Sequence, residues 1–137
     1  MPDIANESPK EGAARLTAFV QREGFKPVAM YPYKDKDGEA QFVRLRLEKP
    51  DGGKRIYPMS RNGKGWELKE PDFPSGHKPL YKLPEIIKNP EATVWVVEGE
   101  NKVDALSKLG IIATTSGGTT SAAKADWIPL KGRNVMI

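Results

Sequence analysis

The sequence contains no cysteine and only one histidine, His77, among its 137 residues. The absence of cysteine excludes disulfide bonds and metal sites built from thiolates, and one imidazole cannot form a histidine cluster. A metal ion bound by this chain would therefore have to be a hard cation held by carboxylate oxygens.

The sequence also lacks an apolar run that approaches the roughly 18 residues needed to cross a bilayer. Its first residues, MPDIANESPK, contain no hydrophobic segment of the kind found in secretory signal peptides. We therefore expect a cytoplasmic protein with no membrane partner. A length of 137 residues suits one domain, or two small lobes.

The net charge is modest, at +4, but the basic residues are concentrated between residues 40 and 69. That segment holds eight basic residues against three acidic ones: Arg44, Arg46, Lys49, Lys54, Arg55, Arg61, Lys64 and Lys69 against Glu48, Asp51 and Glu67. Such a patch predicts contact with a phosphate backbone, and the candidate residues are Arg44, Arg46, Lys54, Arg55, Arg61 and Lys64. The alternative is a solvated face of surface strands.

The N-terminal part of the chain predicts a short disordered segment followed by a helix. Residues 1–8 are polar and lack periodicity, so we expect them to be disordered. Ser8 provides an N-cap with a proline and a glutamate at the positions typical of a helix start. Apolar side chains then recur at Leu16, Phe19 and Val20, which predicts one amphipathic helix over residues 9–23.

The segment from residue 27 to residue 68 changes to a strand period. Four strand-like runs are separated by turns rich in aspartate, asparagine and glycine, which is typical of an antiparallel β-meander. In the second run, alternation places Phe42, Arg44 and Arg46 on one face. Val43, Leu45 and Leu47 lie on the other face. Trp66, Tyr31 and Phe42 are candidates for base stacking beside these strands, although core packing is the alternative for each.

The last part of the chain predicts a parallel sheet. Residues 70–90 read as a proline-rich linker with one helical turn at 84–88, which closes an α+β lobe over residues 9–90. Val94–Val97 is a continuous apolar run, as expected for a strand buried on both faces. A helical stripe over 101–109 and a second β-prone run over 111–115 complete a Rossmann-like βαβ unit.

A third apolar strand begins at Val135, and the sequence stops at Ile137. We therefore expect that residues 91–137 form a partial domain, truncated within its third strand.

Glu98 directly follows the first strand of this βαβ unit. In open parallel sheets, ligand-binding groups lie at the carboxyl ends of the strands. Gly99 permits a turn, and Glu100 lies at the start of the next helix. Such carboxylates can bind a hard cation or exchange a proton with a nucleophile. The alternative is that Glu98 and Glu100 only cap the helix.

A small-residue loop that includes Gly117 and Gly118 is a second candidate site. Backbone N–H groups of such a loop can hold an anion in front of a helix, which would make these glycines phosphate-binding. The alternative is a simple crossover connection, since the pattern is not that of a Walker A loop.

The chain resembles the first half of a toprim domain, as found in DNA primases and primase-helicases of phages and mobile elements. The resemblance covers roughly residues 28–137. It rests on Val96-Val97-Glu98-Gly99-Glu100, Val103-Asp104-Ala105-Leu106, Leu109-Gly110 and Ala113-Thr114-Thr115-Ser116, preceded by Tyr31-Pro32-Tyr33, Asp37-Gly38, Trp66, Pro79-Leu80-Tyr81 and Leu83-Pro84-Glu85.

The resemblance implies that Glu98 is a general acid/base or a metal-facing carboxylate in nucleotidyl transfer, with Glu100 as a second, weaker ligand. It also implies Mg²⁺ or Mn²⁺ as the cofactor of the complete protein, held mainly by paired aspartates beyond the third strand. Two features depart from the family pattern. Lys102 stands where family members commonly carry an aspartate, and the chain ends before the paired aspartates.

The sequence thus predicts part of a DNA primase that makes RNA primers on single-stranded DNA during replication. The expected partners are a single-stranded DNA template, nucleoside triphosphates, and a helicase domain or helicase partner. By itself, residues 1–137 are expected to be inactive. Two alternatives stay open: a non-catalytic nucleic-acid-binding or docking module with a degenerate toprim core, and a toprim nuclease or topoisomerase-type domain.

Overall fold

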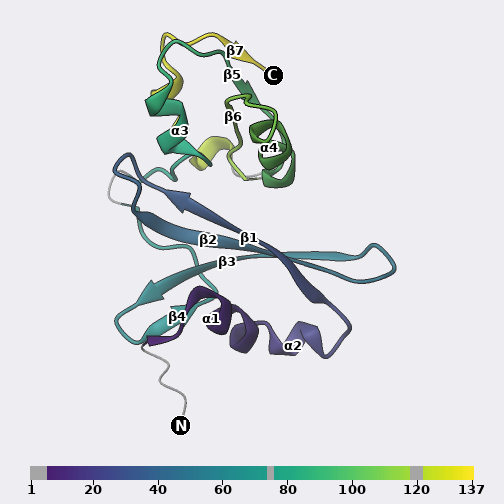
Figure 1. The fold of residues 1–137 in the computed structure, drawn as a ribbon. Helices are drawn as coiled ribbons and strands as arrows, with labels where there is room; N and C mark the ends of the chain where they lie inside the picture. Colours follow the sequence, from purple (N-terminus) through teal and green to yellow (C-terminus); the bar gives the residue numbers. More distant parts are fainter. Residues whose placement is uncertain (1–5, 74–75, 118–121) are drawn as a thin grey trace. The chain divides into compact units, whose positions relative to one another are not determined.

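A computed structural model of the chain describes residues 6–73, 76–117 and 122–137 (Figure 1). These residues divide into two units. The meander unit consists of the described residues up to Pro32 together with Gln41–Pro71, and the parallel-sheet unit consists of Tyr33–Ala40 together with the described residues from Asp72 onward. The sequence pattern predicts a boundary between the two units after residue 90, so the two divisions differ.

The predicted N-terminal helix forms, but it is divided into α1 (Pro9–Leu16) and α2 (Ala18–Gln21). Ser8 and Glu11 make the reciprocal capping box that the sequence predicts. The break lies at Thr17, whose hydroxyl donates a 2.7 Å hydrogen bond to the Ala13 carbonyl one turn earlier. A threonine hydroxyl that bonds back to this carbonyl competes with regular helix geometry and bends the chain.

Because of the break, the expected apolar stripe is buried only in part. Val20 is 2% exposed and contributes to the core, whereas the neighbouring Phe19 is 52% exposed. The prediction that both side chains face the interior was therefore wrong for Phe19.

The β-meander is confirmed, with strands in the order β1-β2-β3-β4 (Figure 1). The strands are β1 (Lys26–Lys34), β2 (Ala40–Glu48), β3 (Lys54–Asn62) and β4 (Gly65–Glu67). β2 and β3 are antiparallel, with Leu45 opposite Tyr57 and Leu47 opposite Arg55. Residues opposite each other point to the same face, so this register decides which basic side chains share a face.

One face of the meander packs on α1 and α2. The core consists of buried apolar residues from the helices, from the loop after α2 and from the two central strands: Ala13, Val20, Phe25, Val43, Leu45, Leu47 and Met59. The alternation predicted for β2 is confirmed, because Val43, Leu45 and Leu47 are buried while Arg44 and Arg46 are only half-buried.

Trp66 closes this core against α1. A Cβ atom added at Gly12 would lie 2.6 Å from Cδ1 of Trp66, so the helix and the indole approach as closely as glycine allows. The indole N–H donates to the Glu7 carbonyl at 3.1 Å, and the Arg61 guanidinium lies 5.1 Å from the ring centroid. The tryptophan is therefore held on several sides.

Residues 1–8 were expected to be disordered. Residues 1–5 lie outside the described residues, but Glu7 and Ser8 make specific contacts. Both carboxylate oxygens of Glu7 accept hydrogen bonds of 2.9 Å from the Arg15 guanidinium. This bidentate bond lowers the pKa of Glu7 below its ordinary value, with a smaller contribution from the positive charge of Arg61.

The Glu7–Arg15 bond predicts a pH-dependent contribution to stability. A carboxyl group whose pKa is lowered by folding stabilises the folded state above its unfolded-state pKa, and this contribution disappears as the pH falls through the folded-state pKa. Glu7→Gln should therefore lower the melting temperature at pH 7. The difference in melting temperature from wild type should shrink progressively below about pH 4.5, which is the ordinary pKa of a glutamate side chain. Thermal unfolding measured from pH 2 to pH 8 tests this, and a constant difference would contradict it.

The parallel-sheet unit contains α3 (Leu83–Lys88), α4 (Glu100–Ser107) and three short strands. These strands, β5 (Val94–Val96), β6 (Ala113–Thr114) and β7 (Val135–Met136), form a parallel sheet in the order β6-β5-β7. The described residues between β6 and β7 include two 3₁₀ helices, Ala122–Lys124 and Ile128–Leu130. The βαβ unit β5-α4-β6 and the third strand are confirmed.

Only one face of β5 is well covered. Val94 is fully buried and packs with Leu80, Ile86 and Ala125, whereas Trp95 is 38% exposed. The prediction of a strand buried on both faces was therefore wrong at Trp95. Leu109 is also exposed, because α4 ends at Ser107.

Arg133, two residues before β7, links the start of this strand to α3 through hydrogen bonds. Its guanidinium donates to the carbonyls of Ile86, Asn89 and Ala92 at 3.2, 2.6 and 3.0 Å. These carbonyls belong to the last turn of α3 and the loop after it, and those of Ile86 and Asn89 also accept backbone hydrogen bonds from the N–H groups of Asn89 and Ala92. Among the residues that the structure describes, no helix combines the length and apolar character needed to cross a membrane.

Candidate functional site

Glu98 lies just beyond the carboxyl end of β5, the central strand of the parallel sheet. The position is the one expected for a ligand-binding group. Gly99 is the N-cap of α4 in an extended conformation, with φ −149° and ψ 157°. Any residue can adopt this conformation, so the backbone does not require glycine here, although an added Cβ would lie 3.1 Å from Oδ1 of Asn101.

The side chain of Glu98 is 70% exposed and forms an ion pair with Lys102, one helical turn further along. Glu98 precedes the helix and Lys102 lies in its first turn, so the lysine side chain reaches back to the carboxylate. An exposed pair of this kind contributes at most about 1 kcal/mol to stability. Lys102, the residue that departs from the family pattern, thus contacts the proposed catalytic carboxylate directly.

Glu100 has the opposite environment from Glu98. Its side chain is buried, and Oε2 accepts a 2.7 Å hydrogen bond from the hydroxyl of Tyr33, which is fully buried. As the first residue of α4, its negative charge is also favoured by the helix dipole. A structural role is therefore the better interpretation for Glu100, whose carboxylate bonds to Tyr33, while Glu98 faces solvent.

A second tyrosine repeats this contact one turn along α4. The Tyr81 hydroxyl donates a 2.8 Å hydrogen bond to Oδ1 of Asp104, and the rings of Tyr33 and Tyr81 lie 5.2 Å apart. We call these four residues, Tyr33, Tyr81, Glu100 and Asp104, the tyrosine clamp. Tyr33 and Tyr81 belong to the segments that carry the toprim resemblance, but nothing in the sequence assigns them this role. A local signal is the spacing of two carboxylates four residues apart on one helix.

Two lysines accompany the tyrosine clamp. The ammonium of Lys78, a buried residue, lies 5.5 Å from the Tyr33 ring centroid, and that of Lys82 lies 5.5 Å from the Tyr81 centroid. Lys82 also lies 3.9 Å from Asp104. Asp104 is therefore engaged by a tyrosine and a lysine.

The described carboxylates do not fit a magnesium site. Magnesium prefers several carboxylate or phosphate oxygens in octahedral geometry. Here Glu98 is ion-paired with Lys102 and Glu100 is hydrogen-bonded inside the fold. Over residues 6–73, 76–117 and 122–137, no cluster of three or more acidic, histidine or cysteine side chains is suited to a metal ion.

The predicted basic patch is divided between the two faces of the meander. Arg44 and Arg46 lie on one face, and Lys54 shares it because Lys54 pairs with Glu48. Arg46 donates a 2.7 Å hydrogen bond to Glu48. Arg55 lies on the opposite face, since it pairs with Leu47 of the core.

The other two candidates lie near the end of β3. Arg61 lies six residues after Arg55 on β3, so both side chains point to the same face. Arg61 stacks on Trp66 and donates to the Glu7 carbonyl at 3.2 Å. Lys64 is exposed in the turn before β4. The six basic residues therefore do not form one continuous surface.

Two of the three aromatic candidates for base stacking are core residues. Tyr31 is 6% exposed and Phe42 is 1% exposed, so neither ring is accessible to a base. Trp66 is half-buried and held by Glu7 and Arg61, as described above. The core alternative is confirmed for Tyr31 and Phe42.

The glycine loop is described only in part. The N–H of Gly117 donates a 3.1 Å hydrogen bond to the hydroxyl of Thr115, so it is satisfied within the fold. Gly118 lies outside the described residues. The phosphate-binding role of these two glycines stays a prediction.

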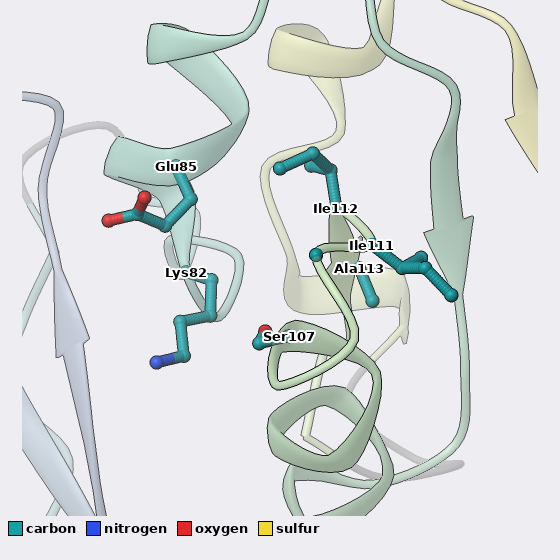
Figure 2. A pocket seen from close by; sticks show the side chains of 7 residues that line it. Lys82, Glu85, Ser107, Ile111, Ile112 and Ala113 are labelled. Carbon is teal, nitrogen blue, oxygen red and sulfur yellow. The ribbon is translucent and has the colours of Figure 1, made fainter.

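A separate pocket of about 270 Å³ lies between the start of α3 and the segment that leads into β6. Figure 2 shows Lys82 and Glu85 on the α3 side, Ser107 at the end of α4, and Ile111, Ile112 and Ala113 from the segment leading into β6. Glu98, Glu100 and the predicted basic residues are not part of its lining.

Comparison of the sequence and the structure with known protein families, curated proteins and solved structures finds no match.

Proposed function

We propose that this chain is part of a toprim-type DNA primase that makes RNA primers on single-stranded DNA. The observation that carries the proposal is the position of Glu98, an exposed carboxylate at the carboxyl end of the central parallel strand and directly before α4. This arrangement agrees with the toprim resemblance of residues 28–137. The toprim fold and the magnesium requirement are both part of the proposal.

Glu98 would act as a proton acceptor in nucleotidyl transfer. In primer extension, a 3′-hydroxyl attacks the α-phosphate of a nucleoside triphosphate, and the bond to pyrophosphate breaks as the new P–O bond forms. The hydroxyl proton must be taken up by a base. An exposed carboxylate can approach a bound substrate, and the Lys102 ammonium beside it can hold a phosphate oxygen in place of Glu98.

A template-directed primer synthesis assay on the gene product that contains residues 1–137 tests the proposal. Glu98→Gln keeps the shape of the side chain but cannot accept the proton, so we expect nucleotide incorporation in Mg²⁺ or Mn²⁺ to fall by about 100-fold or more. Glu91→Gln, at another exposed glutamate, is the matched control and should leave the rate unchanged. Equal rates for wild type and Glu98→Gln would contradict the role of Glu98, and strand nicking would favour a nuclease or topoisomerase-type domain.

The ion pair between Glu98 and Lys102 favours a second candidate, a non-catalytic nucleic-acid-binding module. In that case Lys102 neutralises the carboxylate permanently. The gene product would then bind single-stranded DNA without synthesising primers, and Lys102→Asp would not produce activity.

A further inference from the structure

The meander unit carries an aromatic pair, formed by Phe19 and Tyr57, whose first member is exposed. Phe19 of α2 is 52% exposed and lies against Tyr57 of β3, with ring centroids 6.0 Å apart and ring planes inclined at 58°. Tyr57 is half-buried and packs against the core on its inner side. Phe19 thus rests on a fixed neighbour while about half of it faces solvent.

Two cations lie against Phe25, a core residue on the α2 side of the sheet. Arg55 and Tyr57 are two residues apart on β3, and both pair with core leucines of β2, so their side chains point to the α2 side of the sheet. The Arg55 guanidinium and the Lys49 ammonium each lie 4.6 Å from the centroid of Phe25, which follows α2. Both side chains therefore make cation–π contacts with the buried Phe25 ring, near the end of the β2–β3 hairpin.

The charge along these segments is positive. The end of α2, the start of β1 and the β2–β3 hairpin carry five basic residues against three acidic ones: Arg22, Lys26, Lys49, Lys54 and Arg55 against Glu23, Glu48 and Asp51. The carboxylate of Asp51 accepts a hydrogen bond from the Gly53 N–H inside the hairpin turn. An aromatic platform with neighbouring cations matches a strand that has stacking bases and a phosphate backbone.

The opposite face of the meander lacks this combination among the described residues. Its aromatic side chain in β2, Phe42, is 1% exposed, and Arg46 is hydrogen-bonded to Glu48. Of the two described aromatic side chains Phe42 and Phe19, the one that a base can reach is Phe19 on the α2 face.

We propose that Phe19 and Tyr57 form a stacking site for single-stranded nucleic acid, with Arg55 and Lys49 contacting the adjacent phosphates. The inference rests on the proposed function, because it names the surface on which the template strand would lie. It assigns the strand to the α2 face of the meander rather than to Arg44 and Arg46.

Fluorescence anisotropy with a labelled oligothymidylate of about 20 nucleotides tests the proposal on the chain of residues 1–137. Phe19→Ala should weaken binding roughly five- to tenfold, and Phe19→Tyr should restore it, because stacking on an exposed aromatic ring is lost and regained. Leu109→Ala, at a side chain 75% exposed in the other unit, is the matched control for lost apolar surface. Circular dichroism should show the same fold for all variants.

Charge-reversal variants on the two faces of the meander show which face binds the strand. Arg55→Glu should weaken binding and flatten its salt dependence, whereas Lys88→Glu, at an exposed lysine of α3, should change little. The wild-type chain could bind the strand while the double variant Arg44→Glu/Arg46→Glu is the only variant with weaker binding. In that case the stacking site is wrong and the proposed function stands. If an abasic strand binds as tightly as oligothymidylate, stacking is excluded. If the wild-type chain does not bind even at low salt, both proposals fail.

Discussion

Gly12→Ala is expected to destabilise the protein, although glycine to alanine in a helix normally does the reverse. In an exposed helix the change would add about 0.5–1 kcal/mol of stability, because alanine loses less conformational entropy on folding. Here the new Cβ would lie 2.6, 2.8 and 3.0 Å from Cδ1, Cγ and Cβ of Trp66. The clash involves the root of the side chain as well as the ring, so a small rotation of the indole does not remove it.

The indole also has little freedom to move away, because Glu7 and Arg61 hold it. Overpacking of this kind costs about 1–3 kcal/mol, so the free energy of unfolding should fall despite the better helix propensity. Gly63→Ala is the matched control, because no described atom lies within 4 Å of the Cβ that it would add. Urea unfolding of both variants measures the difference, and a Gly12→Ala protein as stable as wild type would show that α1 and Trp66 are less tightly packed.

Tyr33→Phe is expected to loosen α4, because it removes the hydroxyl that donates to buried Glu100. A hydrogen bond to a charged group contributes about 1.5–3 kcal/mol, and the loss should fall in this range because both partners are buried. Tyr81→Phe removes the equivalent bond to Asp104, whose side chain is 37% exposed and can take a water molecule instead. Its cost should therefore be smaller.

Hydrogen exchange of the α4 amides distinguishes this local effect from a general loss of stability. In Tyr33→Phe, the amides of α4 should exchange faster relative to those of β2 and β3, since the lost bond lies at the start of the helix. The order Tyr33→Phe, then Tyr81→Phe, then wild type is the expected order of exchange rates. Equal exchange in all three proteins would mean that the tyrosine clamp does not hold the helix.

Local patterns in the sequence are sufficient to predict most of the elements. The capping box at Ser8 starts α1, and the turns at Gly38, Gly52 and Asn62 separate the strands of the meander. These signals depend on residues near each other in the chain, where the backbone preferences of glycine and asparagine dominate. The βαβ unit follows in the same way from an apolar run and a helical stripe.

The errors arise where a distant partner decides the outcome. Glu98 and Glu100 look equivalent in the sequence, and only Tyr33, 67 residues before Glu100, makes one of them buried. Similarly, the division of the basic patch depends on the β2–β3 register, which places Arg55 opposite Leu47. Thr17 is a local exception, because its hydroxyl offers the Ala13 carbonyl an alternative bond that periodicity does not reveal. The toprim assignment stays a prediction.

The contacts of Arg133 have a consequence for how the parallel-sheet unit folds. The residue reaches carbonyls that are 41, 44 and 47 positions earlier in the chain. The intervening loop must close before any of these bonds can form, so its closure entropy opposes them until β5, α4 and β6 are in place. The β2–β4 pairings of the meander unit join adjacent strands and need no such closure, although Arg61 and Trp66 reach Glu7 across 54 and 59 positions. Each unit therefore combines local pairings with one late closure, and in the parallel-sheet unit β7 is the strand expected to dock last.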